Sequence, residues 1–109
     1  MSTPFRAALD FDAINRLALA SLPAILARWL PDGTTEAGEY VARNPTRADH
    51  SPGSFKINLR SGKWQDFATG DRGTDAISLA AYLHGLEPYD AADRLAGMLG
   101  LKSGDRRNG

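Results

Sequence analysis

The feature that most constrains the fold is a strict alternation of apolar and polar residues, followed at once by a turn. Every second residue from Phe55 to Leu59 is apolar, which is the period of a β-strand with one buried face. Ser61-Gly62 supplies turn residues, so residues 63–67 are expected to return antiparallel and complete a hairpin. On the return strand Trp64 and Asp66 share one face, and Lys63, Gln65 and Phe67 share the other.

Two amphipathic helices are expected before this hairpin. Asp12 can cap a helix that runs to about Leu22, with its larger side chains along one stripe. Ser21 can cap a second helix, which has Pro23 in its first turn and ends at Pro31-Asp32-Gly33. Residues 34–38 are then a polar connection, and residues 39–43 are a short strand.

Two further helices are expected after the hairpin and a loop at residues 68–74. Thr74 or Asp75 can cap the first of them, and Gly85 closes it. Pro88 opens the second, and Gly100 ends it. The sequence therefore predicts one α+β domain over residues 1–101, a small antiparallel sheet flanked by two N-terminal and two C-terminal helices. Residues 102–109 are polar and are expected to be a flexible tail or the start of a linker.

Composition excludes several classes of protein. None of the 109 residues is cysteine, which rules out disulfides and thiolate metal sites and fits a reducing, cytoplasmic compartment. Thirteen basic and thirteen acidic residues cancel, which argues against a strongly polybasic binder. Residues 40–73 are nevertheless basic, with six cations (Arg43, Arg47, Lys56, Arg60, Lys63, Arg72) against three carboxylates (Asp49, Asp66, Asp71).

Four short stretches follow one another in the middle of the chain: Asn44-Pro45-Thr46-Arg47, Pro52-Gly53-Ser54-Phe55, Asp66-Phe67-Ala68-Thr69 and Gly73-Thr74-Asp75-Ala76-Ile77-Ser78. In their order they resemble the motifs of the zinc-ribbon domain of bacterial and phage DNA primases. That domain carries Cys-Pro-x-His, Pro-Ser-Phe, Cys-x-x-Cys and Gly-Gly-Asp in this order. The matching stretches lie between Tyr40 and Leu83, and the helices before them look like an addition specific to this chain. A cysteine-free version of the same pattern occurs in primase-helicase-like proteins of mobile elements.

The resemblance implies that the zinc ligands have been lost. The former ligand positions are Asn44, Arg47, Asp66 and Thr69, of which only Asp66 is a ligating residue type. His50 lies nearby, but one histidine with one carboxylate is more often a solvated surface residue than a metal site. We therefore expect no metal, and we hypothesise that Arg47 and Asp66 meet where the metal was. In that hypothesis Asn44 and Thr69 hydrogen-bond the two turns, and the added helices supply most of the replacement stability. The alternative is four unrelated surface residues.

The resemblance also implies a non-catalytic module that binds single-stranded DNA template in DNA replication. Independently, such strands are held by a cationic track with aromatic rings on which bases stack. Trp64, Tyr40 and Phe67 are the candidate rings, and whichever of Trp64 and Phe67 points away from the core is the better platform. The expected nucleic-acid-binding residues are Arg43, Arg47, Lys56, Arg60, Lys63, Trp64 and Arg72.

Each of these features also has a purely structural explanation. The basic residues can be an ordinary solvated sheet face, and both rings can be core. Residues 70–74 precede a helix N-terminus and can contact a phosphate with help from Arg72. A helix cap and a tight turn explain that loop equally well, and we favour the cap.

A second class of function is a protein-interaction module that docks on a replication partner after losing contact with DNA. The partner would be a primase or helicase catalytic region or another replication protein. No catalytic set and no cofactor motif is visible, so the chain is not expected to be an enzyme by itself. The apolar stretch at residues 17–30 is too short for a membrane span and contains Arg28.

Overall fold

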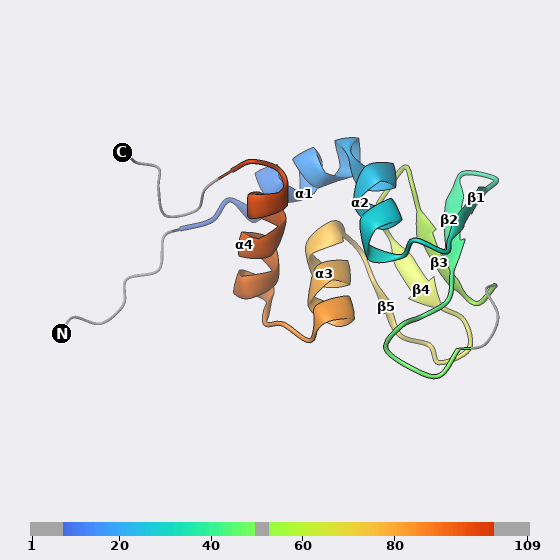
Figure 1. Ribbon diagram of the computed structural model, residues 1–109. Helices are drawn as coiled ribbons and strands as arrows, with labels where there is room; N and C mark the ends of the chain where they lie inside the picture. Colours follow the sequence, from blue (N-terminus) through green and yellow to red (C-terminus); the bar gives the residue numbers. More distant parts are fainter. Residues whose placement is uncertain (1–7, 50–52, 102–109) are drawn as a thin grey trace.

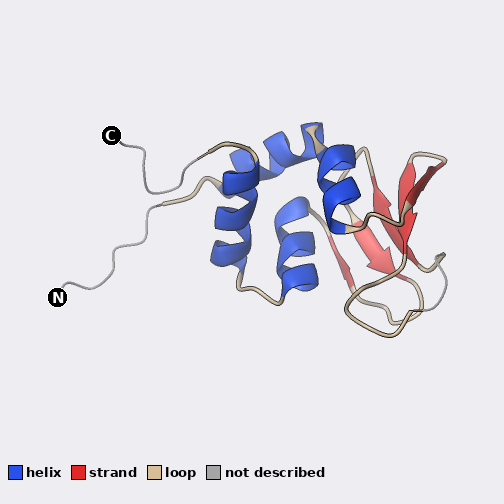
Figure 2. Ribbon diagram, viewed as in Figure 1, coloured by secondary structure: helices blue, strands red, loops and turns tan. Residues whose placement is uncertain are grey.

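The computed structural model describes residues 8–49 and 53–101, which form helices at one end and an antiparallel sheet at the other (Figure 1). Figure 2 shows α2 lying between the other helices and the sheet. His50 and the predicted tail at residues 102–109 lie outside the described residues. The elements are α1 (Phe11–Ala20), α2 (Leu22–Trp29), β1 (Thr34–Glu36), β2 (Glu39–Ala42), β3 (Phe55–Asn58), β4 (Trp64–Asp66), β5 (Arg72–Gly73), α3 (Ala76–His84) and α4 (Pro88–Met98).

The sheet is an antiparallel meander in which the strands lie in sequence order from β1 to β5. The predicted hairpin is β3 and β4, joined through the Ser61-Gly62 turn. Residues opposite each other in antiparallel strands share a face, so the register assigns every side chain to one face. The row Tyr40, Ile57 and Trp64 and the row Ala42, Phe55 and Asp66 form the inner face, and all six residues are buried.

Two adjoining clusters of buried side chains make up the core. One lies among the four helices and consists of alanines with a few larger residues such as Ile14 and Leu95. The other lies between α2 and the inner face of the sheet, around Leu26 and Phe55. Helix α3 contributes to both, with Ile77 in the first and Leu79 in the second. The sheet is therefore fixed against the helices by one face only, and its other face is left open.

The structure corrects three details of the sequence-based prediction. Asp10, not Asp12, caps α1, because its carboxylate accepts the backbone N–H of Ala13 at 3.0 Å. Residues 34–36 are an edge strand, not a polar connection; all three are exposed, so no apolar alternation marked them. The loop after β4 contains the two-residue strand β5, which is too short to have a periodicity of its own.

A two-residue turn explains how the exposed strand β1 forms. Ala37 and Gly38 join β1 to β2 and both have positive φ, at 52° and 83°. Two successive residues of positive φ give the turn type that matches the twist of a hairpin. Turn geometry and pairing with β2 thus hold β1 in place without burial. Within the described part of the chain, no helix has the length and apolar character that crossing a bilayer requires.

Candidate nucleic-acid interface

Two tight turns face each other at one end of the sheet, and they contain the four positions that the resemblance assigns to metal ligands. In the first turn the side-chain oxygen of Asn44 accepts the backbone N–H and the hydroxyl of Thr46, at 2.9 and 2.7 Å. In the second, the Asp66 carbonyl accepts the N–H groups of Thr69 and Gly70, at 3.2 and 2.7 Å. The Thr69 hydroxyl in turn accepts the N–H of Asp71 at 3.2 Å. Each turn is therefore closed by its own hydrogen bonds.

An ion pair between Arg47 and Asp66 joins the two turns. The Nε–H of Arg47 donates to Oδ2 of Asp66 at 2.7 Å, and its Nη2 donates to Oδ1 at 3.2 Å. The Nδ2 of Asn44 donates to the same Oδ2 at 2.8 Å. The predicted meeting of Arg47 and Asp66 is thus confirmed, and Asn44 contacts the carboxylate directly as well as closing its own turn.

Burial gives this ion pair its electrostatic character. Asp66 is 0% exposed, whereas the side chain of Arg47 is 27% exposed. Hydrogen bonds from Arg47 hold the pKa of the Asp66 carboxyl well below its usual range, more strongly than burial raises it, and Asn44 and the N–H of Ala68 add to this effect. The same bond to Asp66 raises the pKa of the Arg47 guanidinium. Both groups are therefore charged at neutral pH, and the buried charge is compensated.

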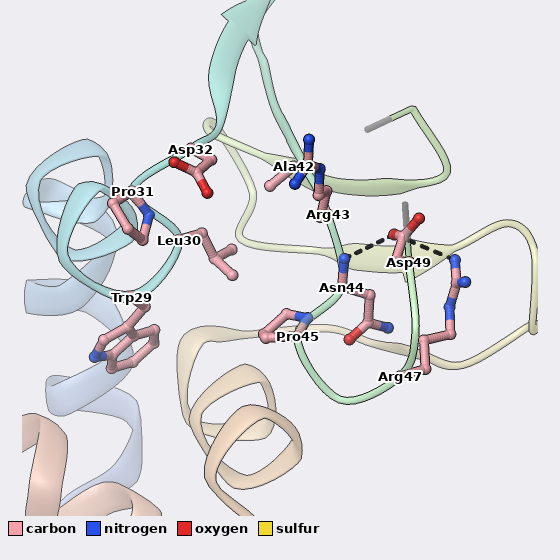
Figure 3. Close-up of a pocket in the computed structure, with 10 residues that line it drawn as sticks. All are labelled: Trp29, Leu30, Pro31, Asp32, Ala42, Arg43, Asn44, Pro45, Arg47 and Asp49. Carbon is pink, nitrogen blue, oxygen red and sulfur yellow. Dashed lines mark hydrogen bonds and ion pairs between the residues drawn. The ribbon is translucent and has the colours of Figure 1, made fainter. Parts of the chain in front are cut away.

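Helix α3 is tied into the same cluster through Tyr82, which the sequence analysis did not single out. Its hydroxyl accepts Nδ2 of Asn44 at 2.8 Å and donates to Oδ2 of Asp71 at 2.7 Å. Asp49 closes the other side, accepting the N–H of Asn44 at 2.8 Å and pairing with Nη2 of Arg47 at 3.4 Å (Figure 3). These partners lie up to 38 residues apart in sequence, so no local pattern could reveal them.

The cluster does not fit a metal ion. Of the four former ligand positions only Asp66 is a ligating residue type, and both of its oxygens are taken by hydrogen-bond donors. Across residues 8–49 and 53–101, no three His, Cys, Asp or Glu side chains lie close enough together to hold a metal. Polar side chains therefore occupy the turns at the positions that the resemblance assigns to ligands.

The open face of the sheet carries a row of long polar and cationic side chains. Lys56 lies opposite Gln65, and Gln65 lies opposite Arg72, so all three project from this face. Lys63 precedes β4, and its carbonyl accepts the N–H of Asn58 at 2.7 Å. Lys56, Lys63, Gln65 and Phe67 line a shallow hollow of about 230 Å³, together with Asn58 and the carboxylate-bearing Glu39.

The structure changes which aromatic ring is available on this surface. Trp64 is 5% exposed, lies in the core and donates its indole N–H to the Ser78 hydroxyl at 3.0 Å, so its ring offers little surface on which a base could stack. Tyr40 is buried as well, and its hydroxyl donates to the Leu30 carbonyl at 2.7 Å. Phe67 is 63% exposed and belongs to the open face. Its place two residues after Gln65 was the signal for this, since alternate residues share a face.

The remaining predicted cations are not all in one place. Lys56, Lys63 and Arg72 lie on or beside the open face, and Arg60 is exposed in the turn between β3 and β4. Arg43 is exposed directly after β2 and lines a separate pocket (Figure 3). Arg47 is committed to the ion pair with Asp66 and is a structural residue in this arrangement.

The loop before α3 is a helix cap, as favoured from the sequence. The Asp75 carboxylate accepts the N–H of Ser78 at 2.8 Å, and the Ser78 hydroxyl accepts the N–H of Asp75 at 3.3 Å. The N–H of Ile77 donates to the side-chain oxygen of Asn15 at 3.0 Å. Side-chain oxygens therefore already engage the donors that a phosphate would use at this helix end.

Comparison with known proteins identifies the fold. No family model and no curated protein matches the sequence. A solved structure does match over 94% of the chain, with a TM-score of 0.71 and 21% identity. It is the crystal structure of the Aquifex aeolicus primase, comprising its zinc-binding and RNA polymerase domains, and the present chain spans 24% of it.

The match confirms the expected fold class, an α+β domain with a primase zinc-ribbon-like sheet, here in a chain without cysteine. It also corrects one expectation. Because the likeness extends over 94% of the chain, it includes the helices before the sheet, which are therefore not an addition specific to this protein.

Proposed function

We propose that this chain is a non-catalytic module of the DNA primase type that binds single-stranded DNA through the open face of its sheet. The observation that carries the proposal is Phe67, a 63% exposed ring on a sheet face that also bears Lys56, Lys63 and Arg72. A ring surrounded by cations is what a flexible polyanion with stacking bases requires. The likeness to part of a primase supports the same reading.

The charges suggest where a strand would lie. Lys56, Lys63 and Arg72 can each neutralise a phosphate, and Gln65 between them can hydrogen-bond a sugar or a base. On the same face Glu36 of β1 lies opposite Glu39 of β2, which lines the hollow beside the lysines, and both carboxylates repel phosphate. The proposed path therefore crosses β3, β4 and β5 and avoids β1.

Energies of this kind of contact predict a weak, salt-dependent interaction. Each phosphate neutralised by a cation contributes a slope of about −0.7 in log affinity against log salt for single strands. One base stacked on Phe67 contributes roughly 1 to 3 kcal/mol. We propose that the module acts in the cytoplasm beside a separate catalytic region, as part of DNA replication.

A titration of a labelled single-stranded thymidine oligonucleotide at two salt concentrations tests the proposal. We expect binding that weakens with salt, and a Lys56→Ala, Lys63→Ala variant with a salt slope smaller by about 1.4 in magnitude. Phe67→Ala is expected to weaken binding by roughly fivefold or more with the slope unchanged. Arg28→Ala removes an exposed cation on α2 and serves as the matched control. Absence of binding at low salt would overturn the proposal.

The competing function, docking on a protein partner through the helices, requires a contiguous apolar surface there. The large exposed apolar side chains of α1 are Phe11 at 36% and Leu17 at 43%. Six residues separate them, which turns the helix by about 240° between them, so they lie on different sides. No single patch on α1 results, and the open sheet face is the better supported interface.

A further inference from the structure

A second concave site lies away from the open sheet face, between the end of α2 and the chain that leaves β2. Figure 3 shows residues 29–32 on one side of this pocket and residues 42–49 on the other. Its volume is about 250 Å³. Leu30, Pro31, Ala42 and Pro45 give it apolar walls, and Trp29 lines it with a partly exposed ring.

Trp29 is held in a fixed orientation. Its ring meets that of His84 on α3 edge to face, with centroids 5.2 Å apart and an angle of 83°. The indole also packs against both core clusters, so it joins the helices to the sheet side of the molecule. An aromatic surface that is already ordered can receive a flat ligand ring at little cost in conformational entropy.

Most of the polar groups that line the pocket are already used. Asn44, Arg47 and Asp49 bind one another and Asp66 in the cluster described above. Asp32 and Arg43 differ, because neither side chain has a hydrogen bond or an ion pair within residues 8–49 and 53–101. Burial raises the pKa of the Tyr40 hydroxyl, and the Asp32 carboxylate adds to this effect only through its charge. The pocket thus offers one available carboxylate and one available guanidinium beside apolar walls and an indole.

We infer that this pocket binds a guanine nucleotide, with the base inside and its phosphate at Arg43. Pockets that enclose a drug-sized molecule start at about 300 Å³, so 250 Å³ suits one ring system with the phosphate at the rim. A guanidinium binds phosphate in a forked geometry. A carboxylate accepts only, and guanine presents two adjacent donors, its ring N1–H and its 2-amino group, whereas adenine, cytosine and thymine present one donor on that edge. Asp32 is therefore suited to guanine above the other bases.

The inference goes beyond the proposed sheet interface and does not depend on it. The nucleotide can come free from solution or as an unstacked member of a single strand, and both present the same base and phosphate. Arg43 directly follows β2, so a strand on the sheet could reach the pocket from that end. Free and strand-borne nucleotide are separated by the experiment.

Amide NMR spectra of the full chain, titrated with guanosine 5′-monophosphate, test the inference directly. The Trp29 indole N–H is the reporter, and the Trp64 indole N–H, buried and bonded to Ser78, is the internal control. We expect a saturable shift of the Trp29 signal alone, and binding of adenosine, cytidine and uridine monophosphates that is roughly tenfold weaker. Absence of a saturable shift at Trp29 would overturn the inference, as would equal affinity for all four nucleotides.

Two variants assign the roles of the charged groups. Asp32→Asn is expected to weaken guanosine monophosphate binding by roughly tenfold and to improve binding of xanthosine monophosphate, because xanthine has a carbonyl where guanine has its amino group. The Arg43→Ala variant is expected to have the same affinity for guanosine monophosphate as for guanosine, which lacks the phosphate. Glu36→Gln and Arg60→Ala change exposed groups outside the pocket and are the matched controls. An Asp32→Asn variant that keeps its guanine preference would contradict the assignment.

An oligonucleotide arm identifies the source of the nucleotide. A thymidine strand with one internal guanosine is compared with an all-thymidine strand, again with the Trp29 indole as reporter. A Trp29 shift with the guanosine strand and not with the all-thymidine strand supports a strand-borne ligand, and a shift with the free monophosphate but with neither strand supports a free one. A Lys56→Ala, Lys63→Ala variant that loses oligonucleotide binding but keeps the monophosphate shift would separate this pocket from the sheet interface.

Discussion

Replacing Asp66 by asparagine tests whether the buried ion pair holds the two turns together. The Asp66 carboxylate is fully buried and accepts hydrogen bonds from Arg47, Asn44 and the N–H of Ala68. Oδ2 accepts from Asn44 and from Nε of Arg47, and Oδ1 accepts from Nη2 of Arg47 and from Ala68. An asparagine keeps one acceptor oxygen, so two donors lose their acceptor whichever way the amide is turned.

The size of the effect follows from that count. A buried group that loses its hydrogen-bond partner costs about 1 to 3 kcal/mol, and Arg47 can recover part of this because it reaches water. We therefore expect Asp66→Asn to lower the free energy of unfolding by about 3 kcal/mol. With a urea dependence of about 1.5 kcal/mol per molar, the unfolding midpoint falls by about 2 M.

Urea unfolding followed by tryptophan fluorescence at pH 7 measures this shift. Asp93→Asn is the matched control, since Asp93 is exposed on α4 and its change should lie within about 0.5 kcal/mol of the unaltered protein. If Asp66→Asn unfolds at the same urea concentration as Asp93→Asn, the ion pair does not stabilise the fold and the reasoning fails.

The difference in unfolding free energy between the unaltered protein and Asp66→Asn depends on pH. The pKa of the Asp66 carboxyl is held below its usual range, chiefly by hydrogen bonds from Arg47, so the unfolded state takes up a proton at higher pH than the folded state. Its contribution is fully present above an unfolded pKa of about 3.9 and is lost as the pH falls through the lower folded value. The difference in stability between the unaltered protein and Asp66→Asn should narrow below about pH 4. A difference that stays constant down to about pH 3 would contradict the assignment.

Two further predictions concern the former ligand positions and the packing of β5. A variant with Asn44→Cys, Arg47→His, Asp66→Cys and Thr69→Cys carries three cysteines and one histidine at the positions that the resemblance assigns to metal ligands. It is expected to bind one zinc ion, measured by elemental analysis and by a rise in melting temperature with added zinc. A variant that folds but stays zinc-free would refute the assignment of these positions. Gly73→Ala is expected to destabilise by about 1 to 3 kcal/mol, because its Cβ would overlap the Trp64 indole and the Ser78 hydroxyl, whereas Gly97→Ala on α4 meets no atom within 4 Å and should stabilise slightly. Equal melting temperatures for the two alanine variants would refute this packing.

Much of the fold could be predicted because its signals are local. The apolar alternation of β3, the Ser61-Gly62 turn and the Gly85 end of α3 are each encoded within a few residues. Strands β1 and β5 could not be predicted in this way, since one is fully exposed and the other has two residues. Their pairing depends on neighbouring strands that are already in place.

The candidate site could likewise be predicted only in part, because several of its contacts join residues far apart in the sequence. The meeting of Arg47 with Asp66 followed from a resemblance in motif order and proved correct in its geometry. The role of Tyr82 could not be predicted, because its partner Asn44 lies 38 residues away and on a different element. The pocket at Asp32 and Arg43 was missed for the same reason, as it forms only where the end of α2 meets the chain after β2.

The burial of one charge also decides which face of β4 can meet a ligand. If Asp66 must point inward to be paired with Arg47, the two-residue period of a strand sends Trp64 inward too and sends Gln65 and Phe67 outward. The sequence pattern alone puts Trp64 and Asp66 on one face of the strand, and the burial of Asp66 decides that this face is the inner one. The contact between Arg47 and Asp66 therefore also sets Phe67 on the open face. A one-residue slip of β4 would both break the ion pair and bury Phe67, so stability and the proposed interface depend on the same register.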